Sequence, residues 1–231
     1  MAENRITRKW LKNHWHYSWW KYMVLAMICI MGTNLLFTMT AYRVPEEKKI
    51  ELYITNGYVD SLTLQEELAS LFFERLPEQE ELTVMNINLL QDDMYAQMQF
   101  TTYLAAQQGD VLLLPRSEVY KLSEGGAENA FMELTPYIDS GLIDLDYVDG
   151  QALTLKDSQG IEGIYAIPAD TLYGLFELGN SPADSYLCLT CFGGNEESAA
   201  GVIGMLFELY QTEKPEGYDA KTGQINASAL F

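Results

Sequence analysis

The residue types that most often perform chemistry in proteins are few in this chain, and their spacing favours no reaction. The sequence has three cysteines and two histidines, and both histidines, His14 and His16, precede a long apolar stretch. Cys188 and Cys191 form a C-x-x-C pair in a segment with strand character, where residues three apart point to opposite faces and lie too far apart for a disulfide. Zinc would need about four ligands. We therefore expect two small buried thiols and no metal.

Acidic residues are abundant, yet none of their groupings matches a known site. A calcium loop that began at Asp144 would need an acid at position 5, a glycine at position 6 and a glutamate at position 12, but the chain has Val148, Asp149 and Leu155 there. The pair Glu196–Glu197 is typical of a helix first turn, where negative charge offsets the dipole. The sequence contains no Ser–His–Asp set, phosphate-binding loop or dinucleotide-binding motif. We expect neither enzymatic activity nor a cofactor.

Charge divides the chain into a basic N-terminus and an acidic remainder. Residues 1–42 carry five basic side chains against one acidic side chain, whereas residues 43–231 carry nine against 32. Nucleic-acid binding needs a basic patch for the phosphates, so we expect no nucleic-acid partner.

An uncharged stretch of 19 residues, from Tyr22 to Thr40, predicts a membrane-spanning helix. At 1.5 Å per residue it would extend roughly 28 Å, close to the thickness of a bilayer's hydrocarbon core. The preceding Lys, Arg and Trp residues favour a cytoplasmic N-terminus with an interfacial aromatic belt. Met39 and the length of the apolar run disfavour signal-peptide cleavage. We expect a single-pass protein of the cell membrane with a cytoplasmic segment at 1–21, an uncleaved signal anchor at 22–41 and an extracytoplasmic C-terminal domain.

The acidic part has the alternating strand and helix pattern of an α/β domain. A continuous apolar run at 111–114 predicts a strand buried on both faces, and further strands are expected at 49–55, 81–90, 161–168 and 186–191. This order predicts a mostly parallel sheet with helices on both faces. The expected helix starts are a Thr63–Glu66 capping box, a cap at Asp92 or Asp93, a cap at Ser117 and a cap at Asn195. The second helix should carry Met94, Met98, Thr101 and Ala105 on one face, and Leu206 should lie in the core.

Four segments resemble the extracellular solute-binding proteins of ABC importers, which have the type 2 periplasmic-binding-protein fold. They are KIELYITNG at 49–57, MYAQMQFTTYLAAQQGDVLLL at 94–114, FMELTPYID at 131–139 and IEGIYAIPAD at 161–170. Members of that family have two lobes that close on a ligand, whereas the 189 residues from 43 to 231 suffice for one α/β domain. We expect a linker at 42–48, a single periplasmic-binding-protein-like lobe at 49–213 and a loose polar tail at 214–231.

The resemblance implies a ligand site at the ends of three strands. It would be formed by Asn56, Gly57, Tyr58, Arg116, Asp170 and Thr171. In a single lobe this site is an open shelf, whereas good small-molecule sites bury most of the ligand. The expected function is a membrane-anchored, solute-binding-protein-like module that binds or senses a small solute weakly, a sugar or a peptide. The alternative is an accessory module of the cell envelope that has lost solute transport and binds a protein, such as an importer component.

Overall fold

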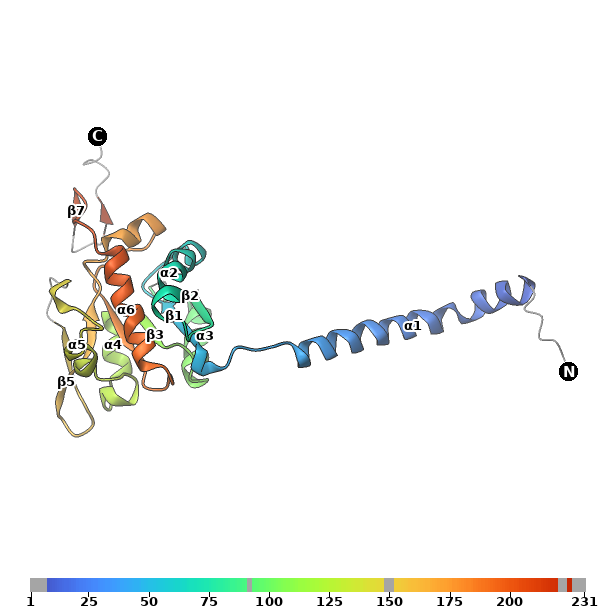
Figure 1. Cartoon of the computed structure of the whole chain (residues 1–231), viewed down its shortest axis with the longest axis horizontal. Helices are drawn as coiled ribbons and strands as arrows, with labels where there is room; N and C mark the ends of the chain where they lie inside the picture. Colours follow the sequence, from blue (N-terminus) through green and yellow to red (C-terminus); the bar gives the residue numbers. More distant parts are fainter. Residues whose placement is uncertain (1–7, 91–92, 148–151, 220–223, 226–231) are drawn as a thin grey trace. The chain divides into compact units, whose positions relative to one another are not determined.

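The computed structural model describes residues 8–90, 93–147, 152–219 and 224–225. The chain falls into two compact units, Met1–Arg43 and Val44–Phe231. The first contains one helix, α1 (Arg8–Thr40), drawn in blue in Figure 1. Its Ser18–Thr40 portion is long and apolar enough to cross a membrane. Within the described residues, the predicted span therefore belongs to a longer helix that starts in the basic N-terminal segment.

The second unit is built on a six-stranded sheet with the order β2-β1-β3-β6-β5-β4. Four strands (β1, β2, β3 and β5) run in one direction, and β4 and β6 run against them, so three of the five pairings are antiparallel. The predicted α/β fold class is confirmed, and the sheet expected to be mostly parallel is mixed, with four of its six strands in one direction. The strand bounds are β1 (Lys49–Ile54), β2 (Glu81–Asn86), β3 (Val111–Pro115), β4 (Leu153–Lys156), β5 (Glu162–Pro168) and β6 (Ser185–Leu189).

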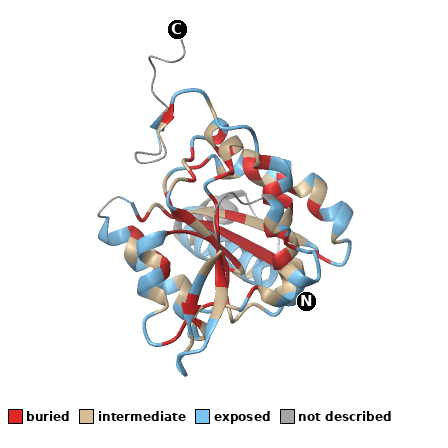
Figure 2. Ribbon diagram, turned by 90° about the vertical axis from the view of Figure 1, so that its left-hand side faces the viewer, coloured by how far each residue is buried: buried red, intermediate tan, exposed pale blue. Residues whose placement is uncertain are grey.

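Helices cover both faces of this sheet. Their bounds are α2 (Ser61–Arg75), α3 (Met94–Ala105), α4 (Arg116–Leu122), α5 (Thr135–Asp139) and α6 (Glu196–Tyr210), with short 3-10 helices at η1 (Glu46–Lys48), η2 (Ala127–Asn129), η3 (Leu145–Tyr147) and η4 (Tyr173–Leu178). One core joins α2, α6 and η4 to one face, and the other joins α3 and α4 to the opposite face. Figure 2 shows the resulting arrangement, with buried strands between helices whose outer surfaces are exposed.

Strand β3 is buried on both faces, as its uninterrupted apolar run predicts. Val111 and Leu113 contribute to the core on one side, and Leu112 and Leu114 contribute to the core on the other. The strand lies between β1 and β6. All four residues are at most 1% exposed, so the strand has no solvent-facing side on which polar residues could alternate with apolar ones.

Two of the predicted helix starts are wrong, and a third is right in position but lacks the side-chain cap bond. Asp60, rather than Thr63, caps α2, because its carboxylate accepts hydrogen bonds from the backbone N–H and the hydroxyl of Thr63. Ser117 does not cap α4, which begins at Arg116 with Pro115 at the cap position. Asn195 occupies the cap position of α6, but its side chain makes no cap bond. The expected cap at Asp93 is confirmed, with the Tyr95 N–H donating at 2.8 Å.

The face of α3 that carries Met94 and Met98 is not the face that packs against the sheet. Met94 and Met98 are 84% and 61% exposed, whereas Ala96 and Phe100 are buried. The helix carries apolar residues on two sides, so its sequence alone does not identify the side that contacts the sheet.

The remaining differences concern the ends of elements. Strand β2 ends at Asn86 instead of reaching residue 90. The segment expected to be a loose tail contains two paired strands, β7 (Tyr218–Asp219) and β8 (Gln224–Ile225). The predicted free thiols are present at Cys188, which is buried, and Cys191, which is partly buried. Residues 148–150 of the acidic segment at 144–150 lie outside the described residues.

Candidate functional site

The carboxyl ends of β1, β3 and β5 meet at one edge of the sheet, because these strands share a direction. The amino end of β6 reaches the same edge, since β6 pairs antiparallel with both β3 and β5. In open α/β sheets this edge is the usual place for a ligand. All six residues that the resemblance implied follow the strands that end here. We call this surface the carboxyl-edge shelf.

Asn56 holds the shelf together and has little left to offer a ligand. Its amide nitrogen donates to the Ser181 carbonyl and the Ser185 hydroxyl, both at 2.9 Å. Its amide oxygen accepts from Asn180 at 3.0 Å, and the side chain is buried. Buried amides of this kind are costly to unpair. Asn56 therefore positions the loop after β1 against the segment that precedes β6.

The neighbouring Gly57 and Tyr58 present that loop to solvent. Gly57 has a φ of 135°, which favours glycine over residues with a side chain. The Tyr58 carbonyl accepts from Asn180 at 3.1 Å, which fixes the backbone. Tyr58 is 65% exposed, so its ring can stack on a planar or sugar-like group.

Arg116 supplies the positive charge of the shelf. Its backbone N–H donates to the Asp184 carbonyl at 3.0 Å, and its guanidinium lies 4.0 Å from the Asp184 carboxylate. The guanidinium also lies over the Tyr120 ring, 5.6 Å from the centroid. The hydrogen bond to the Tyr120 hydroxyl raises the pKa of Arg116, so the group stays charged. With half of its side chain exposed, it can still donate to a carboxylate or another acceptor.

Tyr186 is a shelf residue that sequence reasoning missed. Burial raises the pKa of its hydroxyl, the charge of Arg116 opposes that rise, and the charges of Asp184 and Asp170 add to it. The hydroxyl therefore lies within the electrostatic reach of Arg116 and of both carboxylates. Tyr186 reaches this edge because β6 begins there. Its sequence signal was only an aromatic residue at the start of a strand.

The two remaining predicted residues differ in exposure. Asp170 is exposed, whereas Thr171 is buried and cannot contact a ligand without movement. An aromatic cluster of Tyr173, Phe176 and Tyr218 follows, with the rings of Tyr173 and Tyr218 centred 5.2 Å apart. Asp170 contributes to the raised pKa of Tyr218 after burial and Tyr173, so this cluster borders the shelf.

Large apolar side chains are also exposed around this edge. They belong to the loops after β1 and β2 and to the first turns of the helices that follow, so the direction of the strands gathers them there. We call them the exposed apolar group, comprising Tyr58, Leu62, Leu90, Met94, Tyr95 and Met98. Exposed apolar patches with methionine and tyrosine are typical of adaptable protein-binding surfaces.

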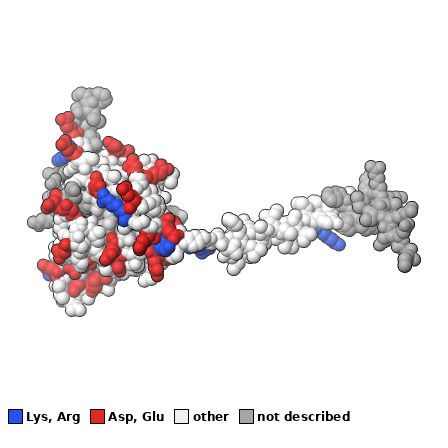
Figure 3. Space-filling model, viewed as in Figure 1, with Lys and Arg blue, Asp and Glu red and all other residues white. Residues whose placement is uncertain are grey.

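The chemistry available at the shelf is recognition by charge, hydrogen bonding and ring stacking. Arg116 provides the donors, Asp170 and Asp184 provide acceptors, and Tyr58 and Tyr120 provide rings. Within the ranges that the structure describes, no group of three or more His, Cys, Asp and Glu side chains is placed to hold a metal ion. Figure 3 shows how strongly Asp and Glu outnumber Lys and Arg on the visible surface of this unit.

No protein-family model matches the chain, and no curated protein matches its sequence. Parts of the fold are similar to solved structures of solute-binding proteins, the family that the sequence resembles. A protein named as a spermidine/putrescine ABC transporter from Listeria monocytogenes has 10% identity and a TM-score of 0.40, with 70% of this chain and 78% of that chain covered. A family 1 extracellular solute-binding protein from Alicyclobacillus acidocaldarius has 13% identity and a TM-score of 0.36.

An N-glycan transport solute-binding protein from Streptococcus pneumoniae, solved with Man1GlcNAc, has 15% identity and a TM-score of 0.32. The match covers 52% of this chain and 24% of that one, and the Alicyclobacillus match covers 56% and 29%. The chain thus spans less than a third of either protein.

Proposed function

We propose that the chain is a membrane-anchored, extracytoplasmic module that binds a small solute weakly at the carboxyl-edge shelf. The observation that supports this most directly is the half-exposed guanidinium of Arg116, which lies 4.0 Å from the Asp184 carboxylate and over the Tyr120 ring at the end of a central strand. These groups can bind a polar solute such as a sugar or a short peptide. In the described residues the shelf consists of one lobe, so a bound solute stays partly in water.

We expect sugars and short peptides to bind with dissociation constants no tighter than about 0.1 mM, which corresponds to little more than 5 kcal/mol. On an open surface each hydrogen bond contributes only about 0.5–1.5 kcal/mol net, and at least roughly 4 kcal/mol of lost translational and rotational freedom must be offset. Calorimetry against a panel of these solutes measures the affinity, and Arg116→Ala should weaken any binding.

Arg75→Ala is the matched control, because Arg75 is also an exposed arginine in an ion pair, with Glu208, but it lies at the end of α2. Micromolar binding that survives Arg116→Ala would contradict a site at the shelf. Micromolar binding that Arg116→Ala abolishes would show that one lobe captures solutes more tightly than its openness predicts.

A second candidate function is an accessory module that binds another protein of the envelope. The exposed apolar group supports this candidate, because exposed methionine and aromatic side chains are typical of adaptable binding surfaces. A protein partner that covered the shelf would also remove a bound solute from water. The two candidates therefore share one surface, and an importer component is one such partner.

The anchoring carries a separate prediction about topology. We expect a cytoplasmic N-terminus, since five Lys and Arg residues precede the apolar stretch of α1. Protease added to intact cells should remove the acidic unit and leave a small membrane-embedded fragment. Permeabilised cells, in which the protease reaches both sides, serve as the control. A secreted form that begins near Tyr42 would show that the anchor is cleaved.

A further inference from the structure

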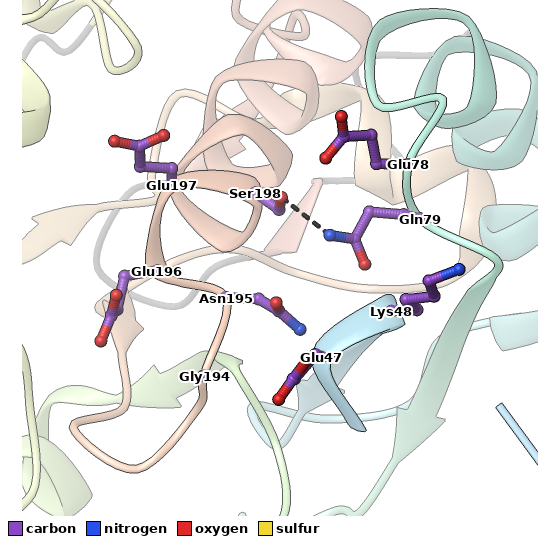
Figure 4. A pocket seen from close by; sticks show the side chains of 9 residues that line it. All are labelled: Glu47, Lys48, Glu78, Gln79, Gly194, Asn195, Glu196, Glu197 and Ser198. Atoms are coloured by element: carbon purple, nitrogen blue, oxygen red, sulfur yellow. Dashed lines mark hydrogen bonds between the residues drawn. The ribbon is translucent and has the colours of Figure 1, made fainter. Parts of the chain in front are cut away.

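A hollow lies at the edge of the sheet opposite the carboxyl-edge shelf, where β1 and β2 begin. It has a volume of about 520 Å3 and is bounded by η1, the turn before β2 and the first turn of α6. Figure 4 shows this hollow from close by. It shares no lining residue with the carboxyl-edge shelf.

The first wall of this hollow is the uncapped amino end of α6. Asn195 stands at the cap position, but its amide nitrogen donates to the carbonyls of Glu46 and Lys49, at 2.8 and 3.2 Å. Within the described residues, the backbone N–H groups of Glu196, Glu197 and Ser198 therefore have no acceptor. A helix amino end with free N–H groups and a positive dipole favours a carboxylate or another anionic oxygen.

The second wall carries a buried amide with an unsatisfied oxygen. Gln79 is 9% exposed, and its amide nitrogen donates to the Ser198 hydroxyl at 3.0 Å. Its amide oxygen is buried and has no hydrogen-bond partner among the described residues. Figure 4 shows this oxygen pointing toward the space between Asn195 and Lys48. A buried acceptor without a donor is unfavourable, so the position calls for a donor.

The rim adds more acceptors and few free cations. Four glutamates, Glu47, Glu78, Glu196 and Glu197, line the hollow, and Lys48, its basic residue, is paired with Glu80. Such a rim repels simple anions and attracts ammonium groups. The hollow therefore offers N–H donors on one wall and acceptors on the other. The hydrogen bond between Gln79 and Ser198 keeps these two walls within a few ångströms of each other.

We infer that this hollow binds a small zwitterion of the α-amino-acid class. Its carboxylate would accept from the N–H groups at the start of α6, and its ammonium would donate to the Gln79 oxygen and the rim carboxylates. A ligand with only a carboxylate would be repelled by the glutamates of the rim. A ligand with only an amine would leave the N–H groups at the start of α6 without an acceptor. A single water needs only about 30 Å3, far less than the hollow provides. The occupant is distinct from any solute on the carboxyl-edge shelf.

The test uses the full chain in detergent micelles and follows isotope-labelled L-alanine by NMR titration. We expect saturable one-site binding in the millimolar range or tighter. Ethylamine, which has the ammonium alone, and propionate, which has the carboxylate alone, should each bind at least tenfold more weakly. Absence of saturable L-alanine binding, or equal binding of either half, would overturn the inference.

Gln79→Met is the decisive variant, because methionine keeps the length of the side chain and removes the unsatisfied oxygen. The free energy of unfolding should change little, because two effects offset each other. The variant loses the hydrogen bond to Ser198, which is unfavourable, and it also loses the buried oxygen without a partner, which is favourable. L-alanine affinity should fall at least tenfold. Gln159→Met, at an exposed turn, is the matched control and should bind as the parent does. Arg116→Ala should also bind L-alanine normally, which separates this site from the shelf. Parental affinity in Gln79→Met would place the ligand elsewhere and refute the assignment.

Discussion

Replacing Leu206 with alanine is expected to lower the free energy of unfolding by about 2–5 kcal/mol. Leu206 lies in α6, is 2% exposed and belongs to the core that joins α2, α6 and the sheet. Alanine would remove the apolar contacts and leave a cavity that a close-packed core cannot fill completely. Urea unfolding of residues 44–231, which form their own compact unit, measures the change.

The matched control is Leu209→Ala in the same helix. Leu209 is 39% exposed, so the same truncation removes fewer buried contacts and should cost less than about 1 kcal/mol. If Leu206→Ala cost less than about 0.5 kcal/mol, the buried face of α6 would be wrongly assigned. Reductant should not change either value, because Cys188 and Cys191 are free.

Asp110 is expected to make the stability of the outer unit depend on pH. Burial raises its pKa to about 6, and the nearby charges of Glu51 and Glu46 add to this, whereas Lys49 and the hydrogen bond from the Glu51 N–H oppose it. The folded pKa lies about two units above an ordinary aspartate value, which corresponds to about 3 kcal/mol. This contribution is fully present below about pH 4 and is lost as the pH rises through 6.

Asp110→Asn should remove this dependence while keeping an oxygen that can accept from the Glu51 N–H, a bond of 2.7 Å in the parent. The difference in unfolding free energy between the variant and the parent should be small near pH 4. It should grow in favour of the variant by up to about 3 kcal/mol at pH 7. The comparison at each pH cancels the titration of the many other acids. A constant difference from pH 4 to pH 7 would show that Asp110 ionises without penalty.

Much of the fold could be predicted because its central elements carry one-sided or uninterrupted apolar patterns. The apolar run of β3 can be buried only in the middle of a sheet, and the periodic apolar face of α6 can be buried only against the core. Helix α3 was different, since Met94 and Met98 form one apolar face while Ala96 and Phe100 form another. Strand β4 was missed because only Leu155 is buried in it and it forms a hairpin with β5.

The shelf was predictable to the extent that strand direction decides it. Parallel strands bring the residues that follow them to one edge, so Tyr58, Arg116 and Asp170 could be placed near one another without coordinates. The reversal of β6 could not be read in the same way, and Tyr186 and Asp184 were therefore missed. The sequence also could not show that the Asn56 side chain forms hydrogen bonds within the protein, because its partners lie 124 to 129 residues further along the chain.

The position of β1 also determines how the domain would bear mechanical load. The chain that follows α1 enters the sheet at Lys49, and β1 lies between β2 and β3 with parallel ladders on both sides. If a partner held the carboxyl-edge shelf while the membrane held α1, tension would run along β1. Both ladders would then be sheared together, with their hydrogen bonds loaded at the same time instead of one after another. Force spectroscopy that pulls between the anchor and Tyr58 can measure this resistance, and a low unfolding force in that direction would show that the strand is peeled instead.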